Sequence, residues 1–398
     1  AADTAEAVAT RNPESGSQLV EDFDSDSDLF ETTDADTLTE ASWKYGEMGP
    51  DGRSAVQDAA DGLSDSGKQD LLDSLGSADD ASSFRAGLDE IRSSSDVDVG
   101  EYFDGSDALP KRAKGRIVDV VGDSDSLSGA DAADARDALR NLDEASDADI
   151  THFIDRGDTS AVKYLSETDQ GEIDNMFSLD VDTSGHDIDT NLAREVRTGL
   201  AKSYGFNKLD SDEIAEVIDD IETLQASDHI EGLPRVLRDG FNKVTGNRDI
   251  VTRVKGATYE MRIAKHLTSR ESELDLEPGE RIRLGYEPDK DGSTVDVNFG
   301  DLEDGSDGPS DDIEYLAERV YGSTDEESIN NVRSALNLDS SSDGPPEFDG
   351  YLVRNDGDVT YFEMKNWQDG SADPSDIKQK TTRFLAYQKL RGGNPRKI

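Results

Sequence analysis

The charge of this chain limits what it can fold into more than any other feature of its sequence. Its 398 residues include 91 Asp and Glu against 41 Lys and Arg, which gives a formal net charge of -50 at pH 7. Only 33% of the residues are hydrophobic and 6% are aromatic, so its cores must be modest. The acidic residues are interspersed with apolar ones at helical spacing, which indicates helices with acidic outer faces.

A composition of this kind has two interpretations. Low hydrophobicity combined with high net charge is typical of disordered chains. Acids spread over amphipathic segments, with scarce Lys, instead resemble proteins of extreme halophiles, because molar salt shortens the screening length to about 3 Å and removes the self-repulsion. We favour the halophilic interpretation for most of the chain, and we predict a flexible acidic lead-in over residues 1–45.

Several classes of site and segment are excluded or left open by the composition. The chain contains no cysteine, which excludes disulfides and thiolate metal sites. Its four histidines are scattered without ligand spacing, which argues against a zinc site. No apolar run approaches the roughly 18 residues of a membrane span. No signal peptide is visible, and the chain starts without Met, so we expect a processed piece of a longer protein.

Residues 46–250 have the pattern of an all-α domain. Leu71, Leu72 and Leu75 lie on one face of a predicted helix, and Ser211 ahead of Ile214 has the pattern of a helix N-cap. Further helices are predicted at 130–142, 148–155, 159–166, 190–203, 211–224 and 232–243. No fixed period is visible, so the sequence predicts no internal repeat.

Residues 251–398 have a mixed pattern, which predicts a second domain. An amphipathic helix is predicted at 253–269, followed by strands at 281–286, 294–299, 348–354 and 359–365. The residues between the last two strands, 355–358, form a good hairpin turn. An insertion at 300–346 holds predicted helices at 311–321 and 325–336, and a final helix is predicted at 375–390.

The predicted hairpin carries a candidate catalytic site. Glu363 and Lys365 share one face of their strand because side chains alternate with a period of two, and the neighbouring strand can bring Asp349 opposite them. Asp349, Glu363 and the carbonyl of Met364 are oxygen ligands of the kind that Mg²⁺ or Mn²⁺ prefers. Lys365 would then orient the attacking water or stabilise the phosphate, while the metal offsets developing charge.

The same residues resemble the signature of the PD-(D/E)XK nuclease superfamily. The resemblance covers residues 250–398 and rests on Pro346 to Asp349, the hairpin, and Glu363 to Lys365, with Glu260 on the preceding helix. It implies that Asp349 and Glu363 bind metal, that Lys365 is catalytic and that Glu260 completes or supports the metal site. Three departures are Pro346 standing three residues before Asp349, the long insertion, and a final strand for which only 396–398 remain.

The resemblance completes the expected fold class. We expect an α+β protein whose N-terminal all-α region is followed by a C-terminal α/β restriction-endonuclease-like domain with a central mixed sheet.

The C-terminal segment is basic in an otherwise acidic chain. From residue 377 onward there are seven basic residues and no acidic one. Such a segment beside a metal site is suited to a phosphate backbone, although it could instead neutralise the acidic surface of the protein itself. Trp367 could stack on a base or pack in the core. The nucleic-acid-binding candidates are Lys378, Gln379, Lys380, Arg383, Lys389 and Arg391, with Tyr387, Arg396 and Lys397 as further contributors.

The function that we expect is hydrolysis of DNA or RNA by a metal-dependent endonuclease. The order of the domains suggests the C-terminal toxin of a larger exported protein from a high-salt organism, acting in the cytoplasm of a target cell and bound by a cognate immunity protein. The alternatives are an intracellular restriction or repair endonuclease, and a non-catalytic binding module. The sequence does not distinguish a DNA substrate from an RNA substrate.

Overall fold

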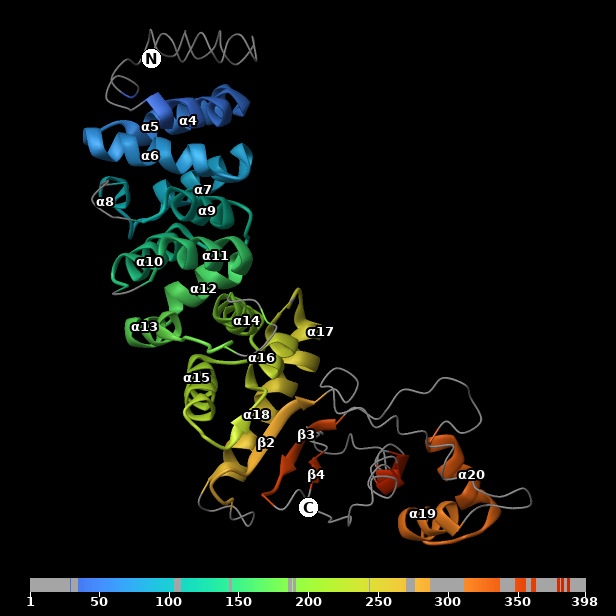
Figure 1. Ribbon diagram of the computed structural model, residues 1–398. Coiled ribbons are helices and arrows are strands. Elements are labelled where there is room, and N and C mark those ends of the chain that lie inside the picture. The colour runs from blue at the N-terminus through green and yellow to red at the C-terminus, as the bar shows by residue number, and fades with distance from the viewer. Residues whose placement is uncertain are drawn as a thin grey trace. The chain divides into compact units, whose positions relative to one another are not determined.

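Helices make up most of the structure, a computed structural model (Figure 1). It describes residues 29, 35–103, 109–142, 145–184, 188, 191–242, 244–269, 276–286, 311–336, 348–355, 359–362, 378–379, 381–382 and 385–386. The chain divides into two compact units. Unit 1 comprises Ala1–Val181, Asp189–Ile218 and Phe241–Val251, and unit 2 comprises Asp182–Ile188, Asp219–Gly240 and Thr252–Ile398.

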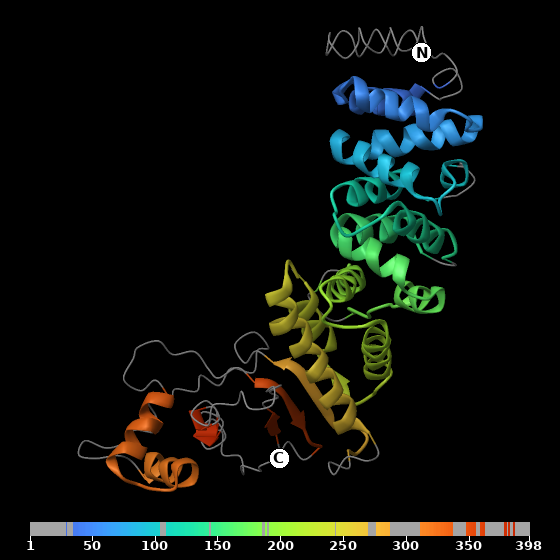
Figure 2. The same ribbon diagram turned by 180° about the vertical axis from the view of Figure 1, so that it is seen from behind.

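Unit 1 is an array of helices stacked in successive layers, as Figures 1 and 2 show. Helix α4 packs on α6, α6 on α9, α9 on α11 and α11 on α14, while α5, α7, α10 and α12 form a second stack. The helices are α4 (Ala35–Glu47), α5 (Pro50–Ala60), α6 (Asp65–Ser77), α7 (Ala81–Ser93), α8 (Val99–Tyr102), α9 (Lys111–Gly122), α10 (Gly129–Arg140), α11 (Asp147–Gly157), α12 (Thr159–Glu167), α13 (Gln170–Ser178) and α14 (Leu192–Gly205). Helix α4 starts within the range for which the sequence predicts a flexible lead-in.

The remaining helices follow α14 in the sequence, and the last two belong to the insertion. They are α15 (Ser211–Gln225), α16 (Leu233–Phe241), α17 (Asn247–Asp249), the π-helix η1 (Ile250–Val254), α18 (Lys255–Thr268), α19 (Asp311–Tyr321) and α20 (Glu326–Ala335). Every helix that the sequence predicts between 130 and 336 is present with ends shifted by a few residues.

Short polar side chains set where the helices begin. In α7, the carboxylate of Asp80 accepts hydrogen bonds from the backbone N–H groups of Ser82 and Ser83 at 2.9 and 3.0 Å. At α15 the capping residue is Asp210, which exchanges hydrogen bonds with Glu213 in both directions, at 2.8 and 3.0 Å. The prediction that Ser211 caps this helix is therefore wrong by one residue, because a capping box needs a spacing of three.

Several polar contacts between layers join residues that lie 40 to 45 positions apart. Arg112 pairs with Asp155 at 3.1 Å, and Arg194 pairs with Asp149 at 2.6 Å, with sequence separations of 43 and 45 residues. The backbone N–H of Asp79 donates a hydrogen bond to the Asp119 carboxylate, 40 residues further along the chain. In these three contacts the acceptor is a carboxylate, which lies on α11 for Asp149 and Asp155 and on α9 for Asp119.

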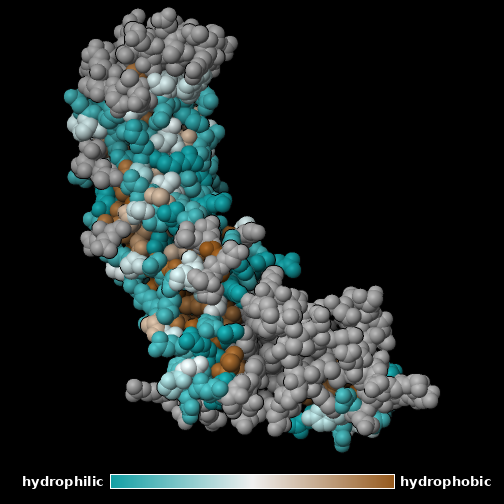
Figure 3. Space-filling view, viewed as in Figure 1, coloured by the Kyte–Doolittle hydropathy of each residue, from teal (hydrophilic) through white to brown (hydrophobic). Residues whose placement is uncertain are grey.

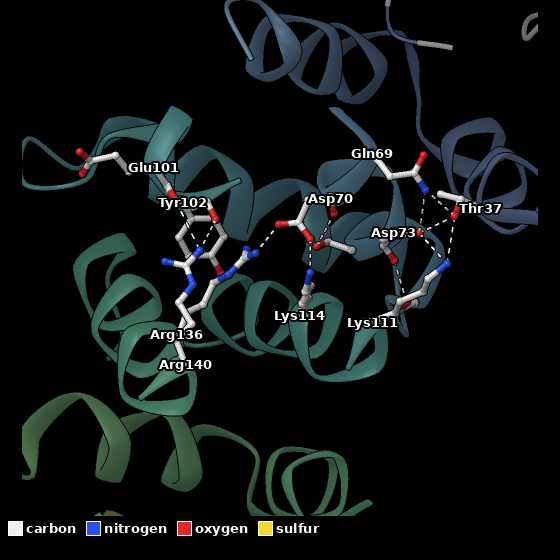
Figure 4. Close-up of polar contacts among 12 residues, drawn as sticks. Thr37, Gln69, Asp70, Asp73, Glu101, Tyr102, Lys111, Lys114, Arg136 and Arg140 are labelled. Carbon is white, nitrogen blue, oxygen red and sulfur yellow. Dashed lines mark hydrogen bonds and ion pairs between the residues drawn. The ribbon is translucent and has the colours of Figure 1, made fainter. Parts of the chain in front are cut away.

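One of these links is fully buried and is drawn in Figure 4. Asp70 on α6 accepts from both Lys114 on α9 and Arg136 on α10, and all three side chains are buried. The Arg136 guanidinium lies over the ring of Tyr102, 4.6 Å from its centroid. Removing one partner of a buried ion pair costs about 3–5 kcal/mol, because the other charge is left without compensation.

A second, more exposed cluster joins α4 to α6 and α9 (Figure 4). Lys111 reaches the Asp73 carboxylate at 2.8 Å and the Thr37 hydroxyl at 3.0 Å. Gln69 also donates to that hydroxyl, at 2.8 Å. Around these clusters the visible face of α4 to α10 is mostly hydrophilic (Figure 3), as the interspersed acidic residues predict.

Unit 2 contains a small sheet of strands β1 (Ile230–Glu231), β2 (Arg281–Tyr286), β3 (Phe348–Val353) and β4 (Val359–Phe362), in the order β1-β2-β3-β4. β1 is parallel to β2, and the pairs β2–β3 and β3–β4 are antiparallel. The predicted strands at 281–286, 348–354 and 359–365 are present in their described parts, whereas the strand predicted at 294–299 lies outside the described residues.

The expected fold class is wrong. The structure is mostly helical, and its strands are only two to six residues long, so the C-terminal part is not an α/β domain built on a central mixed sheet. The physical reason is the distribution of apolar residues. Most long apolar faces belong to helices, while among the strand side chains that the structure describes the buried apolar ones are Ile282, Leu284 and Leu352.

The tight stacking in unit 1 generates a prediction about Gly87 in α7. A Cβ atom at this position would lie 2.0 Å from the carbonyl oxygen of Val118 on α9. Gly87→Ala should lower the unfolding free energy by about 1–3 kcal/mol through overpacking, although alanine favours a helix. The matched control is Gly171→Ala in α13, where nothing lies within 4 Å and no loss is expected. Urea unfolding followed by circular dichroism measures both, and equal stabilities would contradict the proposed close approach.

Candidate functional site

The backbone of β3 and β4 forms the part of the candidate site that the structure describes. Gly350 pairs with Phe362, and Tyr351 pairs with Tyr361. On its other side, β3 pairs with β2 through Gly350 and Leu284 and through Phe348 and Tyr286. Asp349 therefore occupies a paired position inside β3, next to the last described pair of the hairpin.

The two faces of the sheet differ in exposure. Along β2, Ile282 and Leu284 are buried, whereas the side chains of Arg281 and Arg283 are each 47% exposed. This alternation defines a buried face and an open face, and the open face carries Arg281 and Arg283. Arg283 pairs in register with Tyr351. Position 349 is two residues from Tyr351, so both belong to the same alternate set of positions along β3.

Among the predicted catalytic residues, Glu260 and Asp349 are within the described part of the chain. Glu260 lies on α18 and is half-buried, since it is one turn from the buried residues Ala257 and Ala264. Glu363, Met364 and Lys365 lie outside the described residues, directly after Phe362. The structure therefore describes the strand of Asp349 and the helix of Glu260, and the other predicted ligands lie outside the described residues.

Of the predicted nucleic-acid-binding residues, two are described. Lys378 is exposed and its Nζ lies 5.2 Å from the centroid of the Tyr321 ring, at the end of α19. Gln379 is partly exposed. Thr382 is buried and donates to the carbonyl of Lys378 at 2.8 Å, as expected in a helix. Lys380, Arg383, Lys389 and Arg391 lie outside the described residues, as do Trp367, Tyr387, Arg396 and Lys397.

Glu280 is a structural residue of this region that the sequence analysis missed. Its buried carboxylate accepts from the Arg354 guanidinium at 2.9 Å and from the backbone N–H groups of Glu277 and Asn355. Burial alone would raise the pKa of Glu280, but these hydrogen bonds and the Arg354 charge lower it overall. Glu280 therefore joins the turn before β2 to the end of β3, and it fixes the register that positions residue 349.

A signal for this contact was present in the sequence. Glu277 to Glu280 contains Pro278 and Gly279, a turn pattern, and Gly279 has a φ of +97° that glycine adopts without strain. The partner of the turn could not be identified, because Arg354 is 74 residues further along the chain.

Asp119 on α9 is the carboxylate with the largest upward pKa shift among the described residues. Burial raises its pKa to about 7, with Asp79 and Asp123 adding repulsion, whereas the Asp79 N–H and Arg116 act in the opposite direction. A perturbed acid can mark an active site. Here the side chain is 0% exposed, so no substrate can reach it, and we assign it a structural role between layers.

A surface hollow beside α5 and α8 is a poor candidate for binding nucleic acid. Its lining contains one basic residue, Arg92. Its acidic lining residues are Asp58, Asp61, Asp96, Asp98 and Glu101. A phosphate backbone would be repelled there. Within the described parts of the chain, no group of three or more His, Asp or Glu side chains is arranged to hold a metal ion.

Comparisons with known proteins do not identify a family. No family model matches the chain, and neither curated proteins nor solved structures contain a match. In the described residues, no helix is both long and apolar enough to cross a membrane.

The raised pKa of Asp119 predicts a pH dependence of stability. The folded protein holds a proton that the unfolded chain has lost, so this contribution is full below about pH 4 and disappears as the pH rises through about 7. Asp119→Asn keeps an acceptor for the Asp79 N–H and removes the charge. At about pH 8 the unfolding free energy of this variant should exceed that of the wild type by on the order of 1–3 kcal/mol, which raises its melting temperature. At about pH 5 the difference should be smaller.

Thermal unfolding in about 2 M KCl at several pH values measures this gap. Asp89→Asn is the control, because Asp89 is an exposed carboxylate paired with Arg85 on α7. Its difference from the wild type should be constant over the same pH range. A constant difference for Asp119→Asn as well would show that Asp119 does not titrate near neutrality.

Proposed function

We propose that this protein is a metal-dependent nuclease whose active site is the β3–β4 hairpin. In this proposal Asp349, Glu363 and the carbonyl of Met364 bind Mg²⁺ or Mn²⁺, Glu260 supports the metal site and Lys365 acts on the water or the phosphate. The observation that carries the proposal is the register of β3 with β4.

The register supports the proposal because each step back along β3 is one step forward along β4. The described pairs run from Val353 and Val359 to Gly350 and Phe362 without a break. One further step of the same ladder would make Glu363 the partner of Asp349. Directly opposed residues have Cβ atoms about 4.5–5.5 Å apart on one face, which suits two ligands of one cation.

The chemistry of these residues suits phosphodiester hydrolysis. A divalent ion between two carboxylates can bind a phosphate oxygen and lower the pKa of a bound water. Lys365, two residues after Glu363, belongs to the same face by alternation and would supply a cation near the attacked phosphorus. The proposed role of Glu260 requires that α18 approaches this face.

Charge supports a polyanionic substrate in this region. The open face carries Arg281 and Arg283, and the chain from residue 377 onward has seven basic residues and no acidic one. Both lie in unit 2, whereas the described hollow in unit 1 is acidic. Contacts to phosphates dominate nucleic-acid affinity, so we infer that unit 2 binds the substrate.

The test is a cleavage assay of the full chain in molar KCl with Mg²⁺ or Mn²⁺, against DNA, total RNA and tRNA. Asp349→Asn, Glu363→Gln and Lys365→Ala should each lower the rate by roughly 10²–10³-fold, and EDTA should abolish cleavage. Arg262→Gln is the control, because Arg262 is a 46% exposed arginine of α18 that pairs with Asp220.

Cleavage that survives in Asp349→Asn, or that needs no divalent ion, would contradict the proposed site. Circular dichroism of each variant separates loss of chemistry from loss of fold. Growth arrest on expression of the wild type, relieved by Glu363→Gln, would favour the toxin interpretation over a restriction or repair enzyme. Nucleic-acid binding without any cleavage would favour a binding module.

A further inference from the structure

The open face of the sheet has a pair of arginines that share one carboxylate. Arg281 and Arg283 on β2 both pair with Glu231 on β1, at 3.2 and 2.5 Å. The side chains are 47%, 47% and 34% exposed, in the same order. These three residues, which we call the arginine pair and its carboxylate, carry a formal charge of +1 on a chain whose total is -50.

The position of the arginine pair relative to the candidate site follows from the strand register. Arg283 is paired with Tyr351, and Arg281 is paired with Val353. Position 349 is the next position of the same alternate set after Tyr351, and it stands across from Gly285. Diagonal neighbours on one face of a sheet are about 7–8 Å apart, so Arg283 is a diagonal neighbour of position 349.

Gly285 leaves the β2 side of position 349 without a competing side chain. The arginine pair lies further along β2 from this position, at Arg281 and Arg283. Alternate residues of a β-strand are about 6–7 Å apart, at about 3.3 Å a residue, so the two arginines offer two anion-binding positions along β2. The arginine pair thus continues the line along which a phosphodiester backbone could lie.

The contact with Glu231 is of a kind that a phosphate can replace. Exposed ion pairs contribute little to stability, because water screens them and both side chains lose freedom. An arginine fork matches a phosphate through two parallel hydrogen bonds, which are stronger because both partners are charged. A nucleic-acid backbone brings several phosphates at once, whereas Glu231 brings one carboxylate for two arginines.

We propose that Arg281 and Arg283 form a clamp for the phosphate backbone of nucleic acid beside the hairpin, and that Glu231 occupies the clamp in the absence of substrate. The clamp rests on the proposed function for its role in cleavage, but its binding can be measured without catalysis. It adds a backbone-binding element on β2 that the motif of the hairpin does not contain.

The experiment measures binding of the full chain to fluorescently labelled single-stranded and double-stranded DNA and to single-stranded RNA, in EDTA, over a series of KCl concentrations. Arg281→Gln and Arg283→Gln should each weaken binding by roughly five- to tenfold for all sequences, and each should reduce the salt slope by about 1. Glu231→Gln should strengthen binding, because it removes the competing charge. Arg262→Gln, equally exposed and also ion-paired, should bind as the wild type does.

Wild-type affinity and an unchanged salt slope in the variant that carries both arginine substitutions would overturn the clamp. If that variant also cleaves normally while Asp349→Asn does not, only the clamp fails. If the wild type cleaves nothing but its binding depends on both arginines, the clamp stands and the nuclease proposal fails. Absence of any binding by the wild type in EDTA overturns the clamp, while the cleavage assay decides the nuclease proposal separately. Circular dichroism confirms that each variant is folded.

Discussion

The layers of unit 1 pack through apolar helix faces, and carboxylate–cation pairs join them, one group of which is buried. The apolar faces are rich in Ala, Val and Leu. Asp70, held between Lys114 and Arg136, adds a link that is costly to break because it is buried. An acid-rich chain thus uses a few of its carboxylates in the interior and leaves the others in water.

Small residues make this stacking possible. Gly87 and Gly122 stand where the neighbouring backbone approaches too closely for a Cβ atom. Close approach shortens the reach between layers, which lets short Asp side chains at helix ends meet the Lys and Arg side chains of the next layer. Packing and electrostatics therefore depend on each other in this unit, since a larger spacing would separate the charges.

In unit 2 the turn before β2 has a comparable role for the sheet. Glu280 receives Arg354 and two backbone N–H groups, which sets β2 against β3. That register determines which residues of β2 and β3 share the open face. The proposed metal site and the arginine clamp both follow from it, so a shift by one residue would move them to the buried face.

The sequence by itself determined α10, α11, α12, α14, α15 and α16, the helix at Lys255–Thr268, the two helices of the insertion and the hairpin of β3 and β4, whereas α4 begins inside the range predicted as a flexible lead-in. These follow from local periodicity and turn chemistry, which neighbouring residues specify. The site residues were chosen by type and spacing, and of these the structure describes the backbone position of Asp349 and the helix of Glu260.

Only the tertiary structure decided the layer contacts between residues 40 to 45 positions apart, the helical character of the whole, the capping of α15 by Asp210, and the meeting of Arg281 and Arg283 with Glu231. The spacing between layers varies, so a search for a fixed period does not detect them. An ion pair between distant residues leaves no local pattern in the sequence, because each partner by itself has the pattern of an ordinary charged residue exposed to water.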